Sequence, residues 1–311
     1  MSILYGIETS STGGFVTATG KGYSKKVLSF GGDKAQVYVP NIVQPWTHIT
    51  FVIMCHGYLE SETALDNAAW VPPLGKMIDR GWVVCVGNMG GFKWGNDLAM
   101  KYLASYRAWA SEHWVVDRAI LSGGSMGGLA ALNALGRDVI EGLVATVAMV
   151  AVVDTQAMDA GYQSSIQSAY GATSVSDLTA KQAGYDPARD DPNKWANKRL
   201  YLEQGSSDTT VVPALHGDVF MARAATPASI KYVVGNHNHS KVLDDDMLAW
   251  LDEVAPAYDP AQVQEPEPVP DDGEEPTGPP PTPSGSGVYS TSGSQVLVFS
   301  TTGSKVTLSS V

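Results

Sequence analysis

The chain has 311 residues, which suits one large domain with appendages, and its 44% hydrophobic and 17% charged residues are typical of a globular protein. No apolar run approaches the roughly 18 residues that a membrane span needs, which excludes an integral membrane protein. The first residues have neither the basic nor the apolar segment of a secretory signal, so a cytoplasmic location is expected by default. Two cysteines exclude a disulfide-rich scaffold, and each ends an apolar run, which predicts reduced thiols in the core.

The net charge of −12 comes from one segment of the chain. Twelve of the 32 acidic residues lie between Asp244 and Glu275, where there is no Lys or Arg. The remaining 20 acidic residues balance the 20 basic ones, so the acidity says little about the substrate of the main domain. Nucleic acid is not expected as a partner, because no basic patch could displace counterions from its phosphates.

Composition divides the chain into three pieces. Residues 256–283 contain ten of the eighteen prolines, which predicts an extended, semi-rigid, acidic linker after a domain that covers residues 1–255. Residues 284–311 form a Ser/Thr/Gly-rich tail with a near-repeat, STSGSQVLV at 290–298 and STTGSKVTL at 300–308. Each copy has a turn signal followed by a strand-like run. Two short strands are marginal alone, so the tail is either a disordered end or a strand pair that becomes stable by docking to something larger.

Strand-like and helix-like stretches alternate through residues 1–255. The expected strands are Val37–Val39, Ile49–Cys55, Trp82–Val86, Ala119–Leu121, Leu143–Val153, Arg199–Glu203 and Ile230–Val234. The expected helices are Leu65–Arg80, Asn96–His113, Met126–Leu135, Val219–Ala225 and Val242–Val254. Buried strands separated by helices predict an α/β fold, with a mostly parallel central sheet and helices on both faces. The first forty residues predict antiparallel edge strands, and the polar stretch 155–198 predicts a lid or cap.

The clearest chemical motif is Gly123-Gly-Ser125-Met-Gly-Gly128, which lies between an apolar strand and an Ala/Leu-rich helix. The glycines let strand and helix approach closely, so the turn can hold Ser125 in a strained conformation with its hydroxyl exposed. The positive end of the helix then lies beside the oxyanion that forms when the serine attacks a carbonyl. A nucleotide-binding loop is the alternative, but the Gly-x-Gly-x-x-Gly spacing and a basic residue are both missing.

A nucleophilic serine needs a base and an acid that orients the base. Asp208 comes directly after a predicted strand, and two histidines, His237 and His239, follow the next one. The three residue types therefore occur in the chain order Ser, Asp, His, with enough sequence between them for the intervening elements.

Oxyanion donors are expected at two backbone amides. The strand that ends at Cys55 runs into His56-Gly57-Tyr58, which puts the N–H of Tyr58 near the turn that holds the serine. The N–H of Met126 follows the serine at the start of the helix. His56 itself is expected to fix this loop rather than to take part in catalysis.

These motifs together resemble the α/β-hydrolase superfamily over roughly residues 35–255. The shared features are the His-Gly turn, the serine elbow, the Gly-x-x-Asp turn before Val-Val-Pro, and a His before the final helix. Tyr58 and the Ser-Met-Gly-Gly elbow are also similar to cutinase-like polyester hydrolases and to prolyl-oligopeptidase-type enzymes. The resemblance implies a Ser-His-Asp triad that needs no cofactor.

Two triad positions keep alternatives. The run Asn238-His239-Ser240 is similar to the common Asn-His-Ser form of the histidine turn, which favours His239 as base and leaves His237 as the alternative. Asp154 ends another strand, where some members of the superfamily carry the acid, and is the alternative to Asp208. Its other expected role is to cap the lid segment.

Aromatic residues near the strand ends are the expected lining of the substrate cleft. They are Tyr58, Trp70, Phe92, Trp94, Tyr162 and Trp195, and burial in the core is the alternative for Trp94. No Cys/His cluster has the spacing of a zinc site, so no metal is expected.

The sequence therefore predicts a serine esterase that cleaves an ester-bearing substrate through an acyl-enzyme, with an amidase or peptidase of the same fold as runner-up. The linker and tail are similar to those of virion-associated esterases on phage tails. This similarity implies an enzyme that acts on an ester of an envelope polymer or lipid and docks to a larger assembly through residues 284–311. A catalytically silent structural or adhesion component is the alternative from another class.

Overall fold

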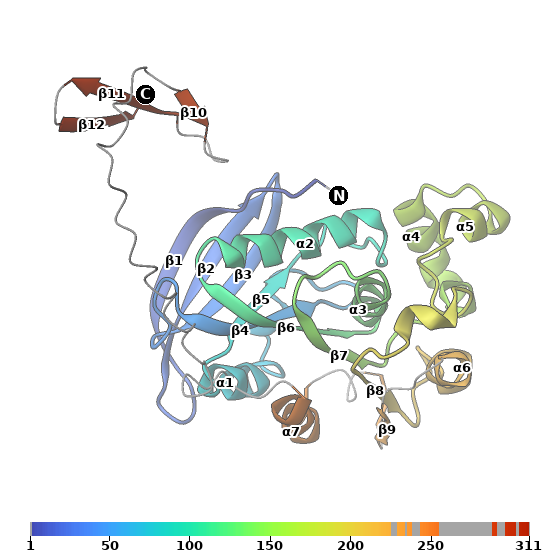
Figure 1. Ribbon diagram of the computed structural model, residues 1–311. Helices are drawn as coiled ribbons and strands as arrows, with labels where there is room; N and C mark the ends of the chain where they lie inside the picture. Colours follow the sequence, from blue (N-terminus) through green and yellow to red (C-terminus); the bar gives the residue numbers. More distant parts are fainter. Residues whose placement is uncertain are drawn as a thin grey trace, which may run out of the picture. The chain divides into compact units, whose positions relative to one another are not determined.

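A nine-stranded sheet forms the centre of the N-terminal part of the chain in the computed structural model (Figure 1). The structure describes residues 2–224, 229–233, 235–237, 243–254, 288–290, 296–302 and 305–310. Contacts divide the chain into two units, Met1–Asp259 and Pro260–Val311. The predicted linker 256–283 lies outside the described residues, so the division into 1–255, 256–283 and 284–311 stays a prediction.

The sheet is parallel in its larger part and antiparallel at one edge. Its strands are β1 (Ile7–Val16), β2 (Gly22–Phe30), β3 (Asp33–Pro40), β4 (His48–Cys55), β5 (Val83–Gly87), β6 (Val115–Gly124), β7 (Leu143–Met149), β8 (Leu200–Gly205) and β9 (Ser229–Val233). Their spatial order is β1-β2-β3-β5-β4-β6-β7-β8-β9. Strands β4 to β9 pair in parallel, whereas β1, β2 and β3 pair antiparallel and β3 joins β5 antiparallel. The predicted antiparallel edge in the first forty residues is confirmed.

Helices cover both faces of this sheet. Successive residues of a buried strand point to opposite faces, so each face presents apolar side chains that a helix can cover. The longer helices beside the sheet are α1 (Val71–Asp79), α2 (Asp97–Ser111), α3 (Met126–Gly136), α6 (Gly217–Arg223) and α7 (Asp245–Val254). On β4, Phe51 and Ile53 belong to the core beneath α2 and α3, while Val52 and Met54 pack in the core with α1 and α7. The predicted α/β fold class is thereby confirmed.

The helix expected over Leu65–Arg80 is divided in two. A 3-10 turn covers Ala64–Asp66, and α1 starts only at Val71. Pro72 and Pro73 occupy the first turn of α1, where their missing N–H groups cost nothing. The residue before a proline is disfavoured in a continuing helix, so the helix begins next to the proline pair.

The strand expected over Leu143–Val153 is shorter than predicted, because β7 ends at Met149. Val150 has a φ of 42°, a left-handed conformation that is strained for a β-branched residue and ends the extended chain. Its N–H still donates to the carbonyl of Glu203 at 2.7 Å, which holds the bend against β8.

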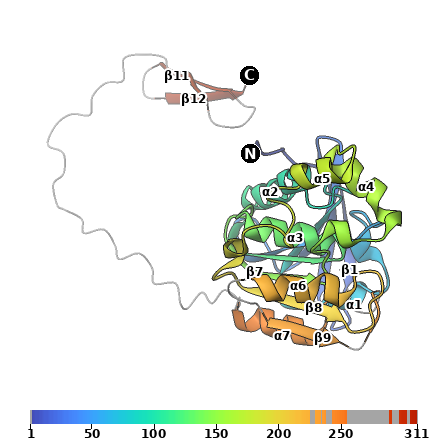
Figure 2. The same cartoon turned by 90° about the vertical axis from the view of Figure 1, so that its right-hand side faces the viewer.

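The polar stretch 155–198 forms short helices rather than an irregular loop. They are a 3-10 turn at Thr155–Ala157, α4 (Ala160–Tyr170), α5 (Val175–Lys181) and a second 3-10 turn at Pro192–Trp195. Figures 1 and 2 show α4 and α5 side by side at one end of the N-terminal unit. Trp94 Nε1 donates to Ser165 Oγ at 2.9 Å, Asn96 Nδ2 donates to the carbonyl of Ala169 at 2.6 Å, and Tyr170 OH donates to the carbonyl of Trp94 at 2.7 Å. These bonds fasten α4 to the loop that follows β5.

The C-terminal unit contains three antiparallel strands in the order β10-β11-β12. They cover Val288–Ser290, Val296–Thr302 and Lys305–Ser310. The near-repeat accounts for β11 and β12, and β10 is a strand that the repeat did not predict. Among the described residues of the whole chain, no helix has the length and apolar character needed to cross a membrane.

Candidate active site

Ser125 lies at the sharp turn between β6 and α3, in a strained conformation. Its φ of 56° and ψ of −119° are outside the regions that a non-glycine residue prefers. Two hydrogen bonds hold the strain: Ser125 N donates to the carbonyl of Met149 at 2.9 Å, and Val152 N donates to the carbonyl of Ser125 at 3.2 Å. Such over-determined strain is typical of functional sites.

The glycines around Ser125 are required by close contacts of α3. A Cβ on Gly127 would lie 2.1 Å from the carbonyl oxygen of Cys55, and a Cβ on Gly128 would lie 2.6 Å from the side chain of Ala151. Because both neighbours are held in or beside strands, any side chain at these two positions would push α3 away from the sheet. The glycines therefore bring the helix N-terminus up to the serine.

The structure brings Ser125, Asp208 and His237 together. The Nε2 atom of His237 lies 3.1 Å from Ser125 Oγ, and its Nδ1 atom lies 2.8 Å from Asp208 Oδ2. With the proton on Nδ1, the ring donates to the carboxylate and accepts from the serine hydroxyl. The other predicted base, His239, lies outside the described residues.

Asp208 is buried and ionised in this arrangement. Its Oδ1 accepts hydrogen bonds from Thr210 N at 2.8 Å and Val211 N at 2.9 Å. Burial alone raises the pKa of the Asp208 carboxyl, but the hydrogen bond from His237 and those from the two amides outweigh it, so that the pKa is lowered overall. A carboxylate held in this way can stabilise a positively charged imidazole.

A backbone contact sets the position of the histidine loop. Both the N–H and the hydroxyl of Ser207 donate to the carbonyl of Gly235, at 3.1 Å and 2.8 Å. The two residues belong to the loops that follow β8 and β9, and the bonds tie one loop to the other. This tie holds Gly235, two residues before His237, beside the loop that carries Asp208.

Asp154, the alternative acid, has other contacts. Its carboxylate accepts from Gln156 N at 2.8 Å, which caps the turn that follows β7, and binds Arg189 through both oxygens at 2.9 Å and 3.0 Å. Arg189 also pairs with Asp186, which is buried. Burial raises the pKa of the Asp186 carboxyl to about 6, although Arg189 counteracts part of this effect. Asp154 thus joins the predicted lid segment to the sheet.

His216 is a buried histidine next to the site that sequence analysis did not single out. It is only 1% exposed, and its Nδ1 accepts hydrogen bonds from the N–H groups of Val153 and Asp154, both at 3.3 Å. Burial lowers the pKa of His216 to about 4, while the charges of Asp154 and Asp208 counteract part of this effect. The ring is therefore neutral at pH 7, with its proton on Nε2.

We predict that His216 makes the fold sensitive to acid. In the unfolded chain His216 has its ordinary pKa of about 6.5 and takes up a proton below that pH, whereas in the folded protein it does so only near pH 4. Stability is therefore lost as the pH falls, by about 3 kcal/mol between pH 7 and pH 4. A His216→Asn variant keeps an acceptor for the two amides and loses this slope. Urea unfolding of both proteins at several pH values measures it, and equal slopes would contradict the prediction.

The loop that carries the predicted oxyanion amide of Tyr58 is held on both sides. His56 places Nδ1 2.7 Å from the carbonyl of Gly57 and Nε2 2.9 Å from the carbonyl of Asn88. The carboxylate of Glu60 accepts from Gly57 N at 2.6 Å. The second predicted donor, the N–H of Met126, is in the first turn of α3, where an amide has no partner within the helix.

Four aromatic side chains gather beside this loop. The ring of Tyr58 lies 4.7 Å from Phe92, 5.5 Å from Trp94 and 5.4 Å from Tyr162, measured between ring centroids. Phe92 is 38% exposed, whereas Trp94 is buried with Met126, next to the serine. Tyr58, Phe92 and Tyr162 therefore form a wall beside the elbow, whereas Trp94 is buried against Tyr58 and Tyr162, which agrees with its alternative prediction of burial in the core.

Two aromatic residues expected in the cleft are instead in the core. Trp195 packs against Phe220 with centroids 5.1 Å apart, and its Nε1 donates to the carbonyl of Leu132 at 3.1 Å. Trp70 packs in the core with α1. Proximity to a strand end in sequence was therefore a poor guide for these two residues.

The strand order, the strained serine between a parallel strand and a helix, and the helices on both faces define the α/β-hydrolase fold. No protein-family model and no curated protein matches the sequence. Within the described residues, no group of three or more His, Cys, Asp or Glu side chains could hold a metal ion.

Solved structures with this fold are similar to the chain. An S-formylglutathione hydrolase from Agrobacterium tumefaciens has a TM-score of 0.55 at 15% identity, with 79% of this chain and 99% of that chain covered. An acetyl xylan esterase from Paenibacillus sp. R4 has a TM-score of 0.56 at 12% identity, covering 81% and 90%. Prolyl oligopeptidase B from Galerina marginata has a TM-score of 0.51 at 16% identity, and 72% of this chain covers 33% of that chain.

Proposed function

We propose that the protein is a serine hydrolase that cleaves carboxylic esters through an acyl-enzyme. The observation that carries this proposal is the imidazole of His237, which lies within hydrogen-bond distance of both Ser125 Oγ and Asp208. A strained serine, a base and a buried, ionised acid are the three parts that nucleophilic acyl transfer requires.

In this mechanism Ser125 Oγ attacks the carbonyl carbon of the ester, and His237 Nε2 takes the hydroxyl proton. Asp208 holds the imidazolium through Nδ1–H. The negative charge on the carbonyl oxygen is stabilised by the amides of Tyr58 and Met126 and by the positive end of α3. The alcohol leaves with the proton from His237, and a water molecule then attacks the acyl-enzyme by the same steps and releases the acid.

The ester is favoured over the amide as the bond that is cleaved. The solved structures that the chain covers nearly from end to end are named as an S-formylglutathione hydrolase and as an acetyl xylan esterase. In the prolyl oligopeptidase, the matched part is only a third of the enzyme. An amidase or peptidase of the same fold remains the second enzymatic candidate. The aromatic wall of Tyr58, Phe92 and Tyr162 would contact the acyl or alcohol group in either case.

Labelling with a fluorophosphonate probe tests the proposal. The wild type is expected to be labelled and to hydrolyse nitrophenyl acetate faster than the matching nitroanilide. Ser125→Ala is expected to lose both the label and turnover, while Ser176→Ala, which changes an exposed serine of α5, keeps both. A well-folded wild type that neither takes the label nor turns over the ester would overturn the proposal and favour a structural or binding component.

The C-terminal unit supports a tethering role beside the hydrolase. Its described strands form a sheet of their own in which β10 and β12 are edges, and edge strands can accept a further strand from another protein. In this proposal the acidic, proline-rich segment 256–283 is a spacer, and residues 284–311 dock the enzyme on a larger assembly such as a virion, from which it acts on an envelope ester.

Deletion of residues 284–311 separates the two roles. The shortened chain is expected to hydrolyse nitrophenyl esters as fast as the full chain, because Ser125, His237 and Asp208 all belong to the N-terminal unit. It is expected to lose co-sedimentation with the assembly. Loss of ester hydrolysis on deletion would contradict a simple tether.

A further inference from the structure

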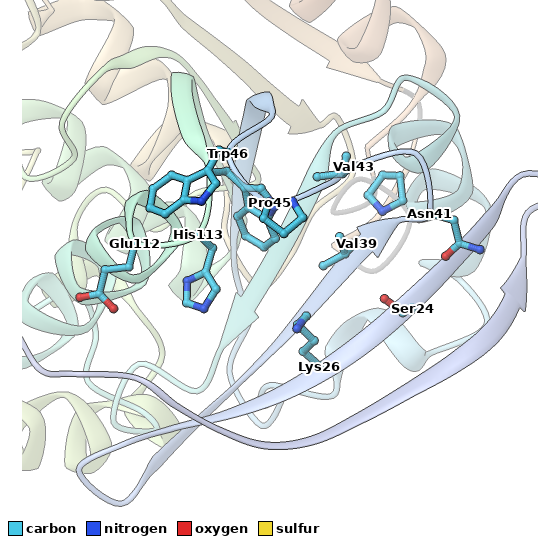
Figure 3. Close-up of a pocket in the computed structure, with 11 residues that line it drawn as sticks. Ser24, Lys26, Val39, Asn41, Val43, Pro45, Trp46, Glu112 and His113 are labelled. Atoms are coloured by element: carbon cyan, nitrogen blue, oxygen red, sulfur yellow. The ribbon is translucent and has the colours of Figure 1, made fainter. Parts of the chain in front are cut away.

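A cavity lies near the start of β4, at the opposite end of the parallel strands from Ser125. It has a volume of about 410 Å³ and is lined by β2, by the loop between β3 and β4, and by the end of α2 (Figure 3). That loop enters β4 at His48, whereas the loop of Tyr58 leaves β4 after Cys55. The two sites are therefore separated by the length of the strand, and the cavity is not part of the proposed catalytic centre.

One wall of the cavity is an exposed tryptophan held in a strained conformation. Trp46 is 67% exposed and has a φ of 64°, which is unfavourable for a bulky residue. Its N–H donates to the carbonyl of His113 at 2.9 Å. Beside it, the N–H of Thr47 donates to the carbonyl of Gln44 at 3.1 Å, and the N–H of Gln44 donates to the hydroxyl of Thr47 at 3.0 Å. An indole kept in water by a strained, hydrogen-bonded loop contributes little to the folded core, and such strain points to a function.

The other two aromatic rings that line this cavity are held in place by a buried neighbour. His113 and Trp114 line the cavity from the end of α2. Both pack against the buried Trp109, with centroids 4.2 Å and 5.5 Å from it, and His113 Nδ1 bonds the carbonyl of Trp109 at 2.9 Å. The wall is therefore preformed, which lowers the conformational cost of binding a flat ligand face.

The remaining lining combines apolar side chains, Val39, Pro40, Val43 and Pro45, with a smaller set of polar ones. Lys26, Ser24, Asn41 and Glu112 supply both hydrogen-bond donors and acceptors, as the sticks in Figure 3 show. The lining carries one ammonium, that of Lys26, and one carboxylate, that of Glu112, and Lys26 also pairs with Glu8 at 2.6 Å. A strongly charged ligand is thus disfavoured, whereas a ligand with many hydroxyl groups finds partners.

We propose that this cavity binds a neutral sugar unit of an oligosaccharide, as an accessory site separate from the catalytic one. A pyranose ring has a face of C–H groups that fits the negative face of an indole, and a rim of hydroxyls that need donors and acceptors. The volume is within the roughly 300–1,000 Å³ of small-molecule sites. A quaternary ammonium ligand also stacks on tryptophan, but it makes no use of the hydrogen-bonding groups of the lining, so choline is the competing probe.

Binding of defined oligosaccharides to the full chain tests this proposal. The probes are cellotetraose, xylotetraose, maltotetraose and tetra-N-acetylchitotetraose, each up to about 10 mM, with calorimetry and tryptophan fluorescence as readouts. At least one is expected to bind the wild type saturably. Trp46→Gly is expected to weaken that binding at least about tenfold, because the stacking surface is gone. Tyr5→Ala, which removes an equally exposed ring outside the cavity, is expected to leave it unchanged.

Two further readouts separate this site from a structural role and from the proposed catalysis. Trp46→Gly relieves the positive φ, so its melting temperature is expected to be no lower than that of the wild type, although it loses the ligand. Its turnover of nitrophenyl acetate is expected to match the wild type. The proposal is overturned if none of the four probes binds, if Trp46→Gly binds as well as the wild type, or if choline binds the cavity and the sugars do not.

Discussion

Replacing His237 with alanine is expected to lower kcat/KM for nitrophenyl acetate by about 10⁶-fold, and His239→Ala is expected to leave it within about tenfold of the wild type. The reason is geometric: the ring of His237 lies 3.1 Å from Ser125 Oγ and 2.8 Å from Asp208. Without it, no side chain among the described residues is in hydrogen-bond contact with Ser125 Oγ to take its proton. Initial rates of both variants, measured beside Ser125→Ala, test the assignment.

The two histidine variants are controls for each other, because they remove the same side chain two positions apart. The His237→Ala protein is expected to stay folded, since Asp208 keeps the hydrogen bonds from Thr210 and Val211. Thermal melting of both variants checks this. The reverse pattern, with activity lost only in His239→Ala, would return the base to the residue that sequence analysis favoured.

The fold could be predicted from the sequence because its signals are local. Apolar, β-branched runs separated by helical patterns predict a parallel sheet covered by helices. The glycines after Ser125 predict a close contact between helix and strand, because such a contact leaves no room for a side chain. A Cβ on Gly127 would lie 2.1 Å from the carbonyl oxygen of Cys55, so the glycine in the motif is explained by the packing of α3 against β4.

The sequence could not decide between His237 and His239 as base, because the loop that follows β9 has no periodic pattern of apolar residues that would predict where each side chain points. The position of His237 beside Ser125 depends on contacts between residues that are distant in the sequence, such as the bond from Ser207 to Gly235, 28 residues apart. The early end of β7 could not be predicted for a similar reason. The run Leu143–Val153 is almost entirely apolar, and no residue in it indicates the positive φ of Val150.

The aromatic residues show the same limit from another side. Trp94 and Trp195 follow similar polar loops in the sequence and both are buried, but Trp94 packs with Tyr58 and Met126 whereas Trp195 packs against Phe220. Trp46 had no motif around it and drew no functional prediction, although its exposure and strained backbone are evident in three dimensions. Tertiary contacts, rather than residue type, separate wall, core and surface.

Changing Asp208 to asparagine is expected to lower kcat by about 10⁴-fold while leaving the fold and the KM nearly intact. The asparagine oxygen can still accept from Thr210 N and Val211 N, so the loop keeps its shape. Its NH₂ group then faces Nδ1 of His237 and donates to it, which moves the imidazole proton to Nε2, toward Ser125. A base that already carries a proton there cannot accept one from the serine.

The matched control for this substitution is Asp154→Asn, the same change at the other candidate acid. It weakens the two-oxygen contact with Arg189 and is expected to lower the melting temperature. It is expected to keep kcat within about tenfold, because the contacts of the Asp154 carboxylate within the described part of the chain are with Arg189 and its own turn rather than with His237. The split between kcat and stability therefore identifies the acid. A large loss of kcat in Asp154→Asn, with Asp208→Asn close to the wild type, would mean that Asp154 orients the base during turnover and that the Asp208–His237 contact belongs to a resting arrangement.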